Sequence, residues 1–175
     1  MVFGTVMQLL SRAMIPVLKT NLPGMHIYVP IKFFLFSMAY RHFLDGFLNK
    51  KVIYGIMIIF ISYSVINSLF IQSIYNQFPN FVRAIGIFIL AIYAMLWFLK
   101  SLREMKITSL RAEPVVWINT GAIIYFSGSF FIFILSNLFL EHSHAILGYS
   151  FRVSTFLMNL FYILIAIGFW KTKKA

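Results

Sequence analysis

The chain has no cysteine and few charged residues, and each shortage excludes a class of protein. Without cysteine there is no disulfide framework, no thiol chemistry and no cysteine-ligated metal centre. Charged residues make up 11% of the 175 residues, against about 25% in ordinary soluble domains. Because so few charges cannot cover a surface that faces water, lipid must surround most of the molecule.

Acidic residues are especially scarce: four Asp and Glu stand against fifteen Lys and Arg, so the net charge is +11. Such an excess is common in nucleic-acid-binding proteins, which carry a continuous basic face. Here the basic residues form short clusters between apolar runs, as expected for the cytoplasmic loops of a membrane protein. We therefore expect the lipid bilayer, and not nucleic acid, to be the partner of this chain.

Long apolar runs account for most of the chain. Residues 52–72 are uncharged and, at about 1.5 Å per residue, long enough to cross a hydrocarbon core of about 30 Å. Similar runs predict an all-α fold, a single transmembrane helix bundle spanning residues 1–175. The expected spans are residues 28–48, 52–72, 81–99, 114–140 and 148–170. Lys32, Arg41, His42 and Asp45 in the first of these are expected near its ends, reaching toward water.

A sixth run, residues 2–18, is at the short limit for a span and contains Arg12 and Pro16. It lacks the basic leading region and the small-residue cleavage site of a signal peptide. It is either a short helix, a re-entrant segment, or a span whose beginning lies upstream of the sequence. The bundle therefore has five or six spans.

The basic clusters alternate with loops that have no Lys or Arg, which predicts the orientation. The basic sites are residues 41–51, 100–113 and 171–174, and the intervening sites are residues 20–27, 73–80 and 141–149. All three basic sites can lie on the cytoplasmic side of a bacterial inner membrane, with the C-terminus inside. Trp97, Trp117 and Trp170 fall at the same edge and would form an interfacial belt.

Polar residues inside the spans indicate faces that meet other helices. Gly121 and Gly128 are seven residues, or two helical turns, apart and share a face. Polar stripes occur at residues 62–68, 119–137 and 154–162. They either pack helix against helix or enclose a polar cavity for a solute. No Asp or Glu lies in the middle of a span, which disfavours proton- or cation-coupled transport.

Two weak patterns resemble chemical sites. Glu141, His142 and His144 form an EHSH loop that, with His26 from another outside loop, could bind a divalent metal. A solvated polar loop is the commoner meaning of such a pattern. His42 and Asp45 are three apart and could act as a base and its orienting group. No standard catalytic or nucleotide-binding motif is present, and we expect no cofactor.

Three stretches, residues 117–137, 26–41 and 161–171, resemble segments of uncharacterised polytopic membrane proteins of Bacteroidota. Such proteins are often encoded near sensor histidine kinases. The resemblance covers most of the chain and implies a membrane location and a signalling partner, but it brings no catalytic or binding residue.

These observations leave three functions open. The leading one is a non-enzymatic sensory or accessory subunit of a membrane signalling system, with a membrane-protein partner or a homo-oligomer. The second is a subunit of a small-solute or ion transporter or channel. The third is a membrane-embedded enzyme acting on lipid, which would use His42 and Asp45 or the EHSH loop.

Overall fold

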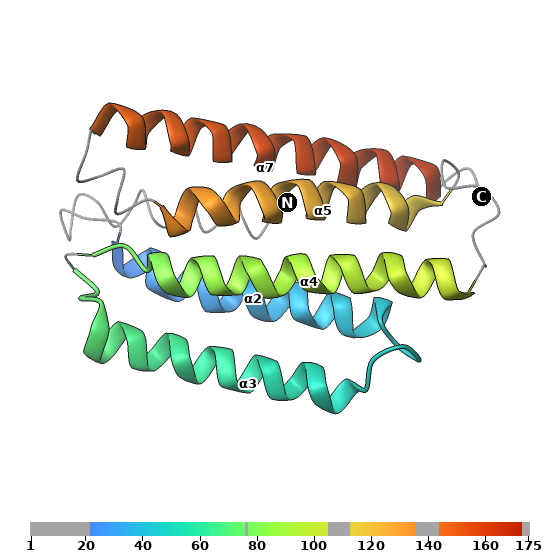
Figure 1. Ribbon diagram of the computed structural model, residues 1–175, viewed down its shortest axis with the longest axis horizontal. Coiled ribbons are helices and arrows are strands. Elements are labelled where there is room, and N and C mark those ends of the chain that lie inside the picture. The colour runs from blue at the N-terminus through green and yellow to red at the C-terminus, as the bar shows by residue number, and fades with distance from the viewer. Residues whose placement is uncertain (1–21, 76, 105–112, 136–143, 173–175) are drawn as a thin grey trace.

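The computed structural model describes residues 22–75, 77–104, 113–135 and 144–172, and these form helices joined by short turns (Figure 1). The predicted all-α fold is confirmed. The helices are α2 (Leu22–Phe43), α3 (Lys50–Ile66), a π-helical extension η1 (Asn67–Ile71), α4 (Asn80–Glu104), α5 (Pro114–Ile134) and α7 (His144–Thr172). The run at residues 2–18 lies outside the described residues.

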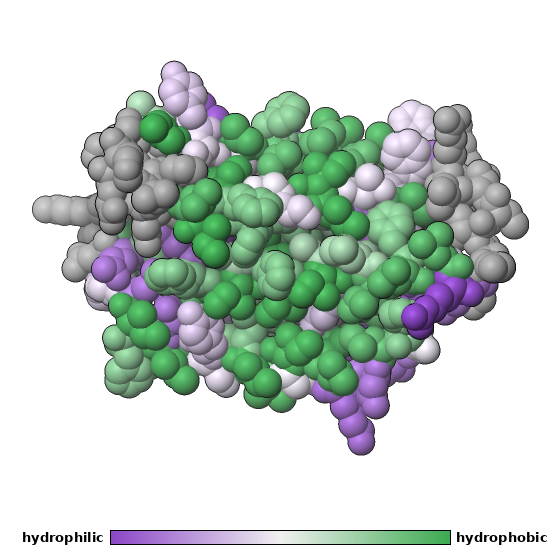
Figure 2. Space-filling model, in the orientation of Figure 1, coloured by the Kyte–Doolittle hydropathy of each residue, from purple (hydrophilic) through white to green (hydrophobic). Residues whose placement is uncertain are grey.

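Five of the helical segments are long and apolar enough to cross a membrane, counting α3 and η1 as one. Large apolar side chains point outward, such as Ile59, which is 70% exposed, and Phe70, which is 82% exposed. Figure 2 shows apolar residues covering most of one face, with hydrophilic residues toward its ends. A soluble protein would bury such surface. The chain is therefore an integral membrane protein.

Helices α2, α4 and α7 run in one direction and α3 and α5 in the other (Figure 1). Helix α4 packs against both α2 and α5, and α5 packs against both α4 and α7. This arrangement brings the end of α2, the start of α3, the end of α4, the start of α5 and the end of α7 to one end of the bundle. We call it the basic end, because the described part of each expected basic site lies there.

Helix α2 is shifted from the span expected at residues 28–48, because residues 44–49 form a turn. Gly46 has a φ of 79°, a left-handed conformation that favours glycine. Asn49 then caps α3: its side chain accepts a hydrogen bond from the Lys51 backbone N–H at 2.9 Å. Lys32 consequently lies half-way along α2. The prediction that it lies near the end of its helix was wrong.

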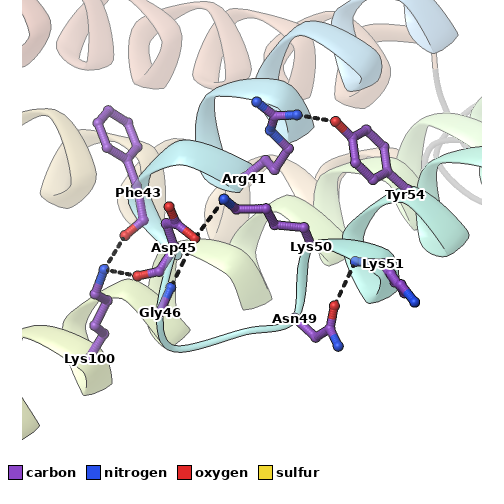
Figure 3. Close-up of polar contacts among 9 residues, drawn as sticks. All are labelled: Arg41, Phe43, Asp45, Gly46, Asn49, Lys50, Lys51, Tyr54 and Lys100. Carbon is purple, nitrogen blue, oxygen red and sulfur yellow. Dashed lines mark hydrogen bonds and ion pairs between the residues drawn. The ribbon is translucent and has the colours of Figure 1, made fainter.

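The turn between α2 and α3 is tied to the end of α4 (Figure 3). Lys100 Nζ donates to the carbonyl oxygens of Phe43 at 3.0 Å and Asp45 at 2.6 Å. The Asp45 carboxylate pairs with Lys50 at 3.0 Å. The hydrogen bond from Lys50, with help from Lys100, holds the pKa of Asp45 below its ordinary value of 3.8. The cations at the basic end thus organise the turn.

Small residues set the distance between α5 and α7, where the predicted shared face of Gly121 and Gly128 packs on α7. A methyl group on Gly121 would lie 2.9 Å from the Phe161 ring, and one on Gly128 2.5 Å from Leu157. On α7, a methyl group on Gly168 would meet the backbone oxygen of Pro114 at 2.9 Å. Close approach through small residues is the usual way membrane helices pack.

Polar side chains from the predicted stripes bond to each other or to backbone between helices. Asn119 on α5 accepts from the Tyr40 hydroxyl at 2.8 Å and donates to the Ala94 carbonyl oxygen at 2.8 Å. Ser129 and Ser154 hydroxyls lie 3.4 Å apart between α5 and α7. These contacts fit the packing interpretation of the stripes. Each such interhelical bond contributes about 0.6 kcal/mol.

The α5–α7 contact leads to the first prediction. Gly168→Ala should lower the thermal unfolding midpoint in mild detergent, because the Pro114 carbonyl cannot yield as a side chain would. Overpacking of this kind costs about 1–3 kcal/mol. Gly55→Ala is the matched control, since nothing lies within 4 Å of its added methyl group. It should leave the midpoint unchanged or raise it. Equal effects of the two substitutions would contradict this packing.

The turn leads to the second prediction. Lys50→Met should raise the pKa of Asp45 toward 3.8, while Lys51→Met should not. Because the folded pKa is lowered, the stabilisation by ionised Asp45 is present above pH 3.8 and lost as the pH falls through the folded pKa. Asp45 is the sole aspartate of the chain, so selective ¹³C labelling gives one carboxyl signal to titrate. An unchanged pKa in Lys50→Met would disprove the pairing.

Candidate functional site

A cluster of positive charge lies inside the bundle, where α2, α4 and α5 meet. Lys32 on α2 points inward, and its Nζ donates a hydrogen bond to the Tyr125 hydroxyl on α5 at 2.9 Å. The same amine lies 4.7 Å from the centre of the Tyr125 ring. The sequence predicted that Lys32 lies near the end of its helix and reaches toward water. Instead, its side chain is held within the spanning part.

Arg83 brings a second positive charge to the same place. It lies in the first turn of α4, and its guanidinium carbon is 3.7 Å from the centre of the Phe133 ring. The guanidinium also lies close enough to the Tyr125 hydroxyl to interact with it electrostatically. The Tyr125 side chain thus lies near both cations, and it is 2% exposed. We call Lys32, Arg83 and Tyr125 the cationic cluster.

Aromatic rings form the floor of the cationic cluster. The Tyr125 ring stacks on Phe161 of α7, with centroids 5.6 Å apart and planes 5° from parallel. Phe36 packs edge-on against Phe126 at 5.5 Å. The Lys32 amine is 5.9 Å from the ring centres of both Tyr28 and Phe36. The negative faces of such rings attract cations, so the floor stabilises the charges without neutralising them.

A small cavity of about 20 Å³ lies beside the cationic cluster, between α2 and α4. Its lining includes Tyr28, Lys32 and Arg83 together with Gly86, where a methyl group would lie 2.8 Å from the Phe60 ring. Both cations are of intermediate exposure. The cluster can therefore be approached from outside the bundle through the space between these two helices.

The metal site suggested for His26 is not favoured by its surroundings. His26 lies within α2 and not in an outside loop, and it is buried. Its Nδ1 is 2.8 Å from the Ser68 hydroxyl and its Nε2 is 3.1 Å from the Gln77 carbonyl oxygen. Both ring nitrogens are therefore occupied, and the imidazole links α2 to η1. No group of three potential His, Asp or Glu ligands occurs among the described residues.

The other predicted metal ligands belong to the EHSH segment, residues 141–144. Glu141 and His142 lie outside the described residues, and His144 is the first residue of α7. The metal prediction for this loop therefore stays a prediction.

The suggested His42–Asp45 pair does not form. Helix α2 ends at Phe43, so Asp45 lies in the turn and its carboxylate contacts Lys50 and the Gly46 backbone N–H. His42 is exposed, and its ring lies beside Phe43. A base needs an orienting partner within hydrogen-bond reach. The geometry gives no support to catalysis by these two residues.

An open groove of about 480 Å³ separates α2 from α3 and η1. Its walls are almost entirely apolar, with Pro30, Ile31 and Phe34 on one side and Val65 and Leu69 on the other. In a bilayer this groove faces acyl chains, so it carries no charge chemistry of its own. It lies on the face of α2 opposite Lys32 and is separate from the cationic cluster.

Sequence reasoning noticed Lys32 alone and missed the cationic cluster. Tyr125 is 93 residues from Lys32 along the chain, and it lies in an aromatic-rich run without a distinguishing motif. The available signal was that both cations fall within apolar runs, where ionisable residues are rare and commonly functional.

No known protein family matches this chain, and neither a curated protein nor a solved structure is detectably similar to it.

Proposed function

We propose that this membrane protein is a non-enzymatic sensory or accessory subunit, which contacts a partner through its basic end on the cytoplasmic side. The observation that carries the proposal is the collection of six described cations at one end of the bundle. They come from α2, α3, α4 and α7: Arg41, Lys50, Lys51, Lys100, Arg103 and Lys171. The described carboxylates Asp45, Glu104 and Glu113 lie at the same end and offset part of this charge.

Two further observations support this role. The described loops are short turns with no room for a soluble domain, and the candidate catalytic pair is not assembled. The resemblance of residues 117–137 to membrane proteins encoded near sensor kinases favours signalling. The hydrogen bond from Lys100 to the turn at Asp45 ties this turn to the end of α4, and the positive surface that results suits recognition of an acidic partner.

A charge reversal tests this proposal. Lys51→Glu should reduce recovery of a specific cytoplasmic or membrane partner in crosslinking and co-purification from native membranes, because Lys51 is exposed at the basic end. Arg152→Glu makes the same charge change at the opposite end, where Arg152 is also exposed, and should leave recovery unchanged. Equal recovery with both variants, or loss with both, would count against a partner at the basic end.

The cationic cluster favours a second candidate, a subunit of a transporter or channel for anions. Fixed positive charges select anions in membrane pathways. Purified protein in liposomes should then release trapped chloride faster than empty liposomes do, without releasing potassium faster. Lys32→Met should slow that release. The absence of chloride release above the background of empty liposomes would remove this candidate and leave the accessory role standing.

A further inference from the structure

The spanning part of the bundle carries positive charge that the described residues do not balance. The described carboxylates, Asp45, Glu104 and Glu113, all lie at the basic end. The cationic cluster lies away from that end, with Lys32 half-way along α2 and Arg83 in the first turn of α4. A guanidinium keeps its proton at any ordinary pH. The interior therefore holds a permanent positive charge whatever the state of the Lys32 amine.

Neutral partners offset only part of the cost of these charges. Placing a Lys or Arg within a membrane-spanning helix is energetically costly. A cation over an aromatic ring recovers only part of that cost. The hydroxyl of Tyr125 accepts a hydrogen bond from Lys32, but it carries no full charge in its neutral form. Two cations beside one neutral phenol leave a strong attraction for an anion.

The space beside the cations limits what such an anion can be. The cavity between α2 and α4 measures about 20 Å³, and a site needs about 10–15 Å³ to hold one water-sized group. It can therefore accept a single oxygen of a larger anion, whose remainder stays outside the helices. Because Arg83 is in the first turn of α4, this opening lies close to the end of a spanning helix.

We propose that Lys32 and Arg83 bind one oxygen of an anionic phosphate or carboxylate group that enters between α2 and α4. Arg83 presents a planar fork that matches such groups, and Lys32 acts as a point charge. Tyr125 is a positioning residue, which holds the Lys32 amine through its hydroxyl. Lipid headgroups and free anions both provide this chemistry. The site does not depend on the proposed partner at the basic end.

Thermal unfolding of the full chain, followed by tryptophan fluorescence, tests the site. Free-anion binding is measured in a non-ionic detergent by titrating sodium phosphate or sodium acetate at constant ionic strength. Lipid binding is measured in nanodiscs of phosphatidylglycerol compared with phosphatidylcholine. At least one of these probes should raise the unfolding midpoint of the wild-type protein. Lys32→Met should weaken the apparent affinity about tenfold or more, because a hydrogen bond to a charged group is lost.

Matched variants separate the cluster from general attraction of anions. Lys51→Met removes one charge from the basic end, where anionic lipid also gathers, and should keep the wild-type response. Arg83→Lys should retain more affinity than Arg83→Gln, because it retains the charge. Tyr125→Phe preserves the ring stacked on Phe161 and should weaken binding without abolishing it. This variant tests the site even if Lys32→Met does not accumulate.

The outcomes are distinct. Stabilisation by phosphatidylglycerol alone identifies a lipid headgroup, and stabilisation by phosphate or acetate in detergent identifies a free anion; either supports the site when Lys32→Met weakens it. No response of the wild-type protein to any probe would overturn the proposal. An equal response of Lys32→Met and Lys51→Met would also overturn it.

Glu141 lies outside the described residues and is the remaining carboxylate that could balance the cluster. If Glu141→Gln and Lys32→Met lower the unfolding midpoint equally and their effects are not additive, Glu141 is the counter-ion and the proposal fails.

Discussion

The structure depends on the constraint that hydrocarbon imposes on polar groups. Lipid tails cannot form hydrogen bonds, so a polar atom in the spanning part is costly unless it finds a partner in the protein. Asn119 shows how the bundle meets this demand, since its amide joins Tyr40 of α2 and the Ala94 carbonyl of α4. His26 does the same between α2 and η1. These hydrogen bonds help determine which helices pack side by side, while small residues determine how closely the helices approach.

The cationic cluster meets the same constraint only in part. Tyr125 gives Lys32 a hydrogen-bond acceptor, and aromatic rings give both cations favourable contacts, but the described residues give them no negative charge. The charges of the basic end are in a different situation, because water can solvate them and Asp45 pairs with Lys50. One set of charges thus lies where water can reach it, while the other is retained inside the bundle despite its cost. That difference separates the two proposed sites.

Much of the fold could be predicted from the sequence, because hydrocarbon leaves few alternatives to helices. Long uncharged runs predicted the all-α fold, and the spacing of Gly121 and Gly128 predicted the face that packs on α7. Helix α2 was misplaced because residues 22–27 contain proline, glycine and histidine, which resemble a loop. Trp97 was expected at an interfacial belt but is 7% exposed and belongs to the core. The cationic cluster joins residues distant in sequence, and one chain gives no signal for such a contact.

The central claim is that lipid surrounds five spanning helices with the basic end on a single side. The absence of native cysteine allows a direct measurement, which is labelling of single-cysteine variants with a membrane-impermeant maleimide in intact cells and in inverted vesicles. Cysteine at positions 51, 103 and 172 should label only from the cytoplasmic face, position 149 only from the other face, and position 59 from neither. Labelling of positions 51 and 103 from opposite faces, or ready labelling of position 59, would contradict the account.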